Sequence, residues 1–128
     1  MTHSKMRGAL ALLAASSFAL ASGPALAHHS FAMFDSQKSV TLDGVVKEFQ
    51  WTNPHSWIQL QVPDPATGKL IEWSIEAGSP NTLSRSGWRP SSLKAGDKAQ
   101  VTIHPMKDGS FGGSLLSASV NGEKIGAS

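Results

Sequence analysis

The sequence of 128 residues contains no cysteine. A protein without cysteine forms no disulfide and offers no thiolate to a metal, so its stability must come from ordinary packing. The sequence also lacks a Gly-x-Ser-x-Gly nucleophile motif, a phosphate-binding glycine loop and a His-Glu-x-x-His zinc motif. These absences argue against an enzyme unless a bound metal carries out the chemistry.

A long apolar run occurs only within the first 27 residues. A basic start is followed by an uncharged run over Gly8–Ser22, by the helix-breaking pair Gly23-Pro24, and by the small-x-small triplet Ala25-Leu26-Ala27. The run is short and rich in alanine for a transmembrane span, and an uncleaved membrane anchor is the alternative. We predict that residues 1–27 are a signal peptide, that the protein is exported to the periplasm, and that the mature chain begins at His28.

Net charge is small once the predicted signal peptide is removed. The whole chain has 11 Lys and Arg against 9 Asp and Glu. Lys5 and Arg7 leave with the signal peptide, so nine residues of each sign remain. A balanced chain has no electrostatic reason to bind nucleic acid or an anionic membrane, and we predict neither as a partner.

The mature chain contains a series of short strand-like segments. Apolar and polar residues alternate in five segments, at residues 40–51, 56–62, 70–77, 97–105 and 114–120. Between the third and fourth segments, Ser79 and Pro80 predict a short helix over 80–86. This order, with a first strand whose alternation changes phase at Gly44, predicts a mostly β protein. The expected fold is a small five-stranded OB-like barrel with one short helix between strands three and four. An open sandwich or roll is the competing architecture.

The predicted organisation is an N-terminal leader over residues 28–39 and a single β-barrel domain over 40–128. The alternation of apolar residues also predicts which side chains form the core. They are Leu42, Val45, Ile58, Leu60, Ile71, Trp73, Ile75, Val101, Ile103 and Leu116.

Several longer stretches of the sequence resemble one known family. "AHHSFAMFD", "GVVKEFQWTNPHSW", "WSIEAGSPNTLSRSGW" and "LKAGDKAQVTIHPMKDGSFGG" are similar to the small exported bacterial proteins of domain-of-unknown-function family 6152. The resemblance covers nearly all of the mature chain. It implies export and a small β domain, but no activity that could be carried over to this chain.

Histidines provide the most concentrated chemistry of the mature chain. Processing would give His28 a free amine beside its imidazole, and His29 follows it. In an OB barrel the start of strand one lies near the end of strand four, which brings the leader toward His104 and Met106. Imidazole and thioether ligands favour copper, so we predict a copper site formed by His28, His29, His104 and Met106. Calcium and magnesium are disfavoured because they need oxygen ligands, which are scarce near these positions, with Asp35 and Asp108 the nearest carboxylates.

His55 is a doubtful further ligand of this site. It stands at the start of strand two, which lies at the end of strand one opposite to the leader. Its alternative role is structural, in a turn made by Asn53-Pro54. The alternative function is a metal-free module that binds a protein or a small ligand on the OB face. Trp57 is predicted to be exposed on this face, and Asn53 and His55 flank it. Glu72 and Glu76 are predicted to be solvated.

The sequence therefore predicts an exported, non-catalytic binding protein whose most concrete ligand is copper. Its partner would be a periplasmic protein or a small ligand. A redox enzyme built on an N-terminal histidine chelate is a third alternative, but it would need a substrate surface that the sequence does not identify. An alternative interpretation is that "HHS" is only a polar start of the mature chain with no ligand, because N-termini are often poorly ordered.

Overall fold

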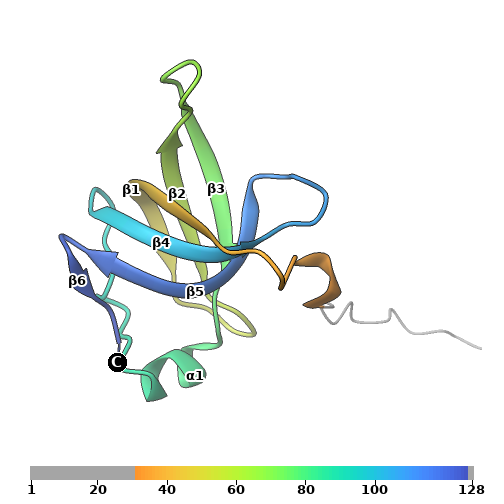
Figure 1. Ribbon diagram of the computed structural model, residues 1–128. Coiled ribbons are helices and arrows are strands. Elements are labelled where there is room, and N and C mark those ends of the chain that lie inside the picture. Colours follow the sequence, from red (N-terminus) through yellow and green to blue (C-terminus); the bar gives the residue numbers. More distant parts are fainter. Residues whose placement is uncertain (1–30, 127–128) are drawn as a thin grey trace, which may run out of the picture.

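The computed structural model describes residues 31–126, and Figure 1 shows their arrangement. The predicted signal peptide, His28 and His29 lie outside the described residues. The elements follow the predicted order, with a 3₁₀ turn before the first strand and a two-residue strand near the end. They are η1 (Phe31–Met33), β1 (Val40–Gln50), β2 (Trp57–Pro63), β3 (Leu70–Glu76), α1 (Pro80–Arg85), β4 (Lys98–Pro105), β5 (Gly112–Val120) and β6 (Glu123–Lys124).

The strands form a closed barrel with the OB topology. They are hydrogen-bonded in the order β3-β2-β1-β4-β5-β6, and a further pairing between β3 and β5 closes the sheet. This closing pair is parallel, with Ser74 opposite Gly112 and Glu76 opposite Ser114, whereas the other pairs are antiparallel. Closure removes the exposed strand edges that an open sheet of this size would present. The predicted fold is confirmed.

The change of phase in β1 lies three residues later than predicted, at Lys47 and not at Gly44. The pairing with β2 shifts register between Val46 and Glu48, which marks a β-bulge. Val46 is therefore the core residue, with 1% of its surface exposed, and the prediction of Val45 was wrong because 37% of it is exposed. At Gly44 a Cβ atom would collide with the carbonyl oxygen of Gln61, so this strand needs glycine for the close approach of β2.

A second bulge corrects the predicted core in β5. Thr102 is opposite Ser117 and Ile103 is opposite Leu115, so Leu116 is the extra residue between them. Leu116 is 48% exposed, and the prediction that it is buried was wrong. Leu115 packs against the core instead.

The remaining predicted core residues belong to the core cluster of the barrel or pack against it, with the exception of Ile71. Ile71 is partly buried and lies outside this cluster. Trp51 and Trp73 also pack against this core, as predicted. Helix α1 lies below the barrel in Figure 1 and contributes Leu83 to the core. The Ser79 hydroxyl accepts a hydrogen bond from the Thr82 N–H, which caps the helix as the sequence predicts.

The described part of the leader runs beside the end of β4. Phe34 forms an isolated antiparallel bridge with Met106, the Asp35 N–H donates to the Pro105 carbonyl at 2.8 Å, and the Lys107 N–H donates to the Met33 carbonyl at 3.0 Å. This confirms the predicted approach of the leader to the end of strand four. Among residues 31–126 no helix is long and apolar enough to cross a bilayer.

Candidate functional site

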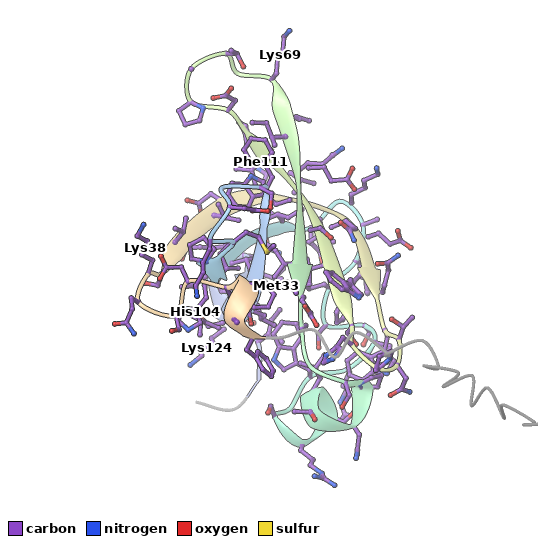
Figure 2. The ribbon with its side chains drawn as sticks, turned by 90° about the vertical axis from the view of Figure 1, so that its right-hand side faces the viewer. Met33, Lys38, Lys69, His104, Phe111 and Lys124 are labelled. Carbon is purple, nitrogen blue, oxygen red and sulfur yellow. The ribbon has the colours of Figure 1, made fainter. Side chains whose placement is uncertain are left out.

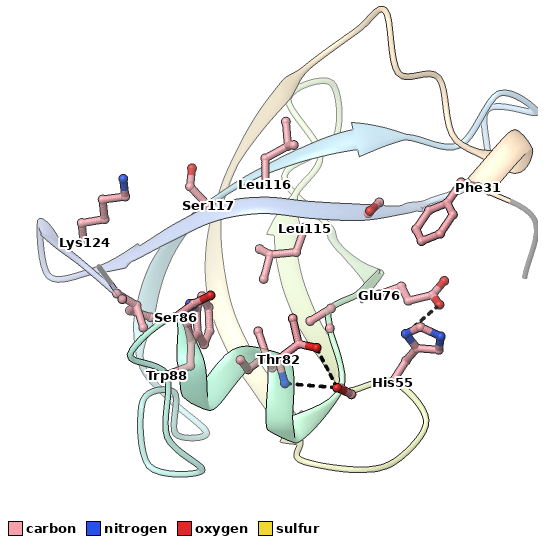
Figure 3. A pocket seen from close by; sticks show the side chains of 17 residues that line it. Phe31, His55, Glu76, Thr82, Ser86, Trp88, Leu115, Leu116, Ser117 and Lys124 are labelled. Carbon is pink, nitrogen blue, oxygen red and sulfur yellow. Dashed lines mark hydrogen bonds and ion pairs between the residues drawn. The ribbon is translucent and has the colours of Figure 1, made fainter. Parts of the chain in front are cut away.

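Two neighbouring hollows lie where the leader meets the barrel, and Glu76 lines both. The first, which we call the His55 hollow, has a volume of about 560 Å³ and lies between α1 and β5. Figure 3 shows that Phe31, His55 and Glu76 lie together at one end of it. Leu83, Trp88 and Leu115 also line it, together with polar residues that include Ser86 and Lys124.

His55 reaches this hollow from the loop between β1 and β2. The loop contains a cis peptide bond between Asn53 and Pro54, and the Thr52 hydroxyl donates to the His55 carbonyl at 2.9 Å. The imidazole is partly exposed, and its Nδ1 lies 3.6 Å from Oε1 of Glu76. This arrangement turns Nδ1 toward the carboxylate and leaves Nε2 as the nitrogen directed away from it. Asn53 is exposed and lines neither hollow.

Glu76 is the residue whose environment differs most from the sequence prediction. It is only 7% exposed, and its Oε2 has no hydrogen-bond partner among the described residues. The prediction that it is solvated was wrong because Glu76 ends β3 where β5 pairs alongside and covers it. Glu72, on the same strand, is exposed as predicted and is bonded to Lys47 at 3.2 Å.

His55 also lies closer to the leader than predicted. It does stand at the far end of β1 from Val40, since Gln50 pairs with Trp57 there. The leader does not stay beside Val40, however, because closure of β3 on β5 brings the end of β4 toward the end of β3. Phe31 consequently lines the same hollow as His55. The expectation that His55 stands at the opposite end of strand one is confirmed, but one leader residue, Phe31, lines the same hollow.

His104 occupies a different position from His55. Its Nδ1 lies 2.7 Å from the Lys38 carbonyl, which accepts the hydrogen bond, so the ring fastens the leader to β4. His104 lines neither of the two hollows. Its ring does leave the core, as its alternation with Val101 and Ile103 predicts.

The second hollow, which we call the Trp57 hollow, has a volume of about 250 Å³. It lies on the face of β2 and β3, beside the loop between β4 and β5. Trp57 is half-buried there and not as exposed as predicted. Figure 2 shows Met33 in η1 and Phe111 above it on the same side of the molecule. Its wall is mainly apolar: Met33, Phe34, Trp57, Met106 and Phe111, with Glu76.

The loop beside the Trp57 hollow carries the Asp108 carboxylate. The Ser110 hydroxyl and backbone N–H donate to Oδ1 of Asp108 at 2.6 and 2.9 Å. These hydrogen bonds, the hydroxyl first, lower the pKa of Asp108 because they stabilise its charged form. Within residues 31–126 no group of three or more His, Asp or Glu side chains is arranged to hold a metal ion.

Comparison with known proteins places the chain in a family. The model of a family of unknown function, DUF6152, matches residues 15–116. The chain belongs to this family. No curated protein matches the chain. Among solved structures, the mitochondrial single-stranded DNA binding protein Rim1 from S. cerevisiae is 13% identical with a TM-score of 0.47, over 70% of this chain and 97% of that one.

For this member of DUF6152, sequence reasoning missed three residues of the two hollows. Phe31 and Met33 stood in a leader without periodicity, and Glu76 followed the alternation of a solvated strand face. A local signal existed only for Glu76, since it directly precedes Ala77-Gly78, where the chain leaves the sheet. The position of all three at these hollows depends on the pairing of distant segments.

Proposed function

We propose that this protein is exported to the periplasm and, after removal of residues 1–27, binds copper for storage or transfer. In this proposal the metal is held by the amine and imidazole of His28 together with the His55 imidazole, and His29 stands beside them. The proposal involves binding and no catalytic step. It keeps the N-terminal chelate predicted from the sequence and exchanges His104 for His55 as its partner.

The position of Phe31 is the observation that supports this exchange. Phe31 lines the His55 hollow, and His28 is three residues before it in the sequence. Each residue of extended chain spans up to about 3.3–3.6 Å, so the processed terminus can reach about 10 Å from Phe31. In this proposal the terminal amine reaches the His55 ring across this hollow without any rearrangement of the barrel.

The pairing of His55 with Glu76 is the arrangement expected around a metal-binding imidazole. Histidine ligands commonly direct their second ring nitrogen to a carboxylate, which fixes the ring and raises its basicity. Here Nδ1 of His55 faces Oε1 of Glu76, so Nε2 would be the nitrogen that binds the metal. Oε2 of Glu76, which has no hydrogen-bond partner among residues 31–126, would gain a nearby positive charge when a cation binds.

Copper is the metal that suits these ligands. A terminal amine has an ordinary pKa of about 7.7–8.0, so a metal displaces its proton near neutral pH. Nitrogen ligands bind copper(II) more tightly than the other divalent ions of its row. His104 then has a positioning role, because its hydrogen bond to Lys38 holds the leader beside β4.

The start of the mature chain is the first requirement of the proposal. Intact-mass measurement of the exported protein should give a chain that begins at His28. A mass that corresponds to a start at Ser30 or later would remove the amine and imidazole together and would contradict the proposed site.

Calorimetric titration with copper(II) tests the ligands. Four proteins are compared: the mature chain, the same chain with one added alanine before His28, H55A and H104A. The added alanine keeps every imidazole but turns the amine of His28 into an amide, so we expect affinity to fall about 10-fold or more, and a similar fall for H55A. H104A should change affinity less than H55A. Equal binding by the mature and extended chains would overturn the proposal.

The metal-free interaction module remains the second candidate function, and exposed aromatic side chains favour it. Phe31 is 78% exposed and Phe111 is 54% exposed, and they stand at the His55 hollow and the Trp57 hollow. Large apolar side chains exposed beside a hollow are typical of a surface that receives a ligand or a partner. If the mature chain bound copper no better than its H55A variant, this candidate would replace copper binding.

A further inference from the structure

We propose that the Trp57 hollow is a separate site for a soft monovalent metal ion, copper(I), bound through the thioethers of Met33 and Met106. This proposal extends the proposed function from oxidised to reduced copper and shares with it the choice of metal and the neighbouring Glu76. Its ligands, its hollow and its test are different.

The fold brings together the two methionines that follow the predicted signal peptide. The chain has four methionines, and Met1 and Met6 lie in the first 27 residues. Met33 and Met106 are far apart in the sequence, yet both line the Trp57 hollow. Backbone hydrogen bonds hold them there, because the Lys107 N–H donates to Met33 and the Met106 N–H donates to the Gly112 carbonyl at 3.2 Å.

The chemistry of the hollow matches a soft ion of low charge. Thioethers are uncharged and polarisable, and they favour copper(I) over calcium or magnesium. The indole of Trp57 lines the same space and can attract a cation to its face. Glu76 also lines it, and its carboxylate would offset a single positive charge.

Packing alone is the ordinary explanation of methionines beside aromatic rings, since sulfur contacts them favourably. Met33 and Met106 are only partly buried, however, and neither belongs to the main core cluster of the barrel. They line an open hollow and do not fill a gap in the interior. The two explanations differ in one respect: leucine can replace methionine in packing but cannot bind a metal.

Titration of the mature chain with silver(I), a redox-inert substitute for copper(I), tests the proposal. The variants are M33L, M106L and the double variant, and W57F identifies the fluorescence change that comes from Trp57. We expect each single variant to bind silver(I) about 10-fold or more weakly and the double variant to lose binding. Copper(I) supplied from a competing chelator should rank the affinities of these proteins in the same order as silver(I) does. Unfolding of the metal-free proteins should show that all three variants fold.

Nuclear magnetic resonance of the methionine methyl groups gives a direct second measurement. The methyl signals of Met33 and Met106 should both shift when one equivalent of silver(I) is added. Unchanged methyl signals, or silver(I) binding by the double variant equal to that of the mature chain, would overturn the proposal.

Failure of this proposal can be distinguished from failure of the proposed function. The alanine-extended chain and H55A should bind silver(I) as the mature chain does, because neither change touches a thioether. The double methionine variant should bind copper(II) as the mature chain does. Loss of silver(I) binding in H55A would show that the two hollows form one site, which would overturn the assignment of a separate thioether site.

Discussion

Replacement of Glu76 by leucine should stabilise the metal-free protein and weaken its binding of copper(II). Glu76 is almost fully buried, and Oε2 has no partner among the described residues. Its Oε1 lies 3.6 Å from Nδ1 of His55, which is beyond the usual range of a hydrogen bond. The side chain is thus removed from water without full compensation.

The expected gain in the free energy of unfolding follows from the missing hydrogen-bond partner of Oε2. An unsatisfied buried polar group costs about 1–3 kcal/mol of stability. Leucine is of similar size and needs no hydrogen bond, so Glu76→Leu should raise the free energy of unfolding by an amount in that range. For a domain of about 100 residues, each kcal/mol corresponds to about 4–8 °C in Tm.

Glu72→Leu is the matched control because it changes the same residue type on the same strand. Glu72 is exposed, and its ion pair with Lys47 at 3.2 Å is on the surface. Loss of such a pair costs about 0–1 kcal/mol. Glu72→Leu should therefore leave the protein equally stable or slightly less stable, and it should not change copper affinity.

Urea unfolding in the presence of a chelator, followed by tryptophan fluorescence, measures both variants. Copper(II) titration of the same samples measures binding. If Glu76→Leu were less stable than Glu72→Leu, the buried carboxylate would have a structural role and the reasoning would be refuted. Stabilisation with unchanged copper affinity would refute its role beside the metal.

Two further predictions concern the bulge in β5 and the loop beside the Trp57 hollow. Leu116→Ser should change the free energy of unfolding by no more than about 0.5 kcal/mol, because Leu116 is exposed. Ile103→Ala should lower it by about 2–5 kcal/mol, because Ile103 is fully buried. If urea unfolding showed similar losses of stability for the two variants, Leu116 would be a core residue. Ser110→Ala should raise the pKa of Asp108 toward its ordinary value of 3.8, measured by nuclear magnetic resonance titration. The pKa of Asp108 is lower in the folded protein than in the unfolded chain. The hydroxyl's contribution to stability is therefore present above the ordinary pKa of Asp108 and is lost as pH falls through the folded pKa. An unchanged pKa in Ser110→Ala would contradict the hydrogen bond from the Ser110 hydroxyl as the cause of the lowered pKa.

Local patterns in the sequence were sufficient to predict most of the fold. Alternation gave the positions of β1 to β5, because one face of each strand is buried whatever its partner is. The Ser79 cap and Pro80 predicted α1 for a similarly local reason. The order of these elements then favoured the OB barrel over an open sandwich, and the structure has that topology.

Only the tertiary structure decided which residues depart from these patterns. A β-bulge is a mismatch between two paired strands, so the alternation of β5 alone could not show that Leu116 is the extra residue opposite β4. The same holds for the two hollows. Parallel pairing of β3 with β5 brings Ser114 beside Glu76 and carries the leader to His55, and no local property of these segments specifies that contact. The sequence determined the residue types available for a metal site, while closure of the barrel decided which of them meet.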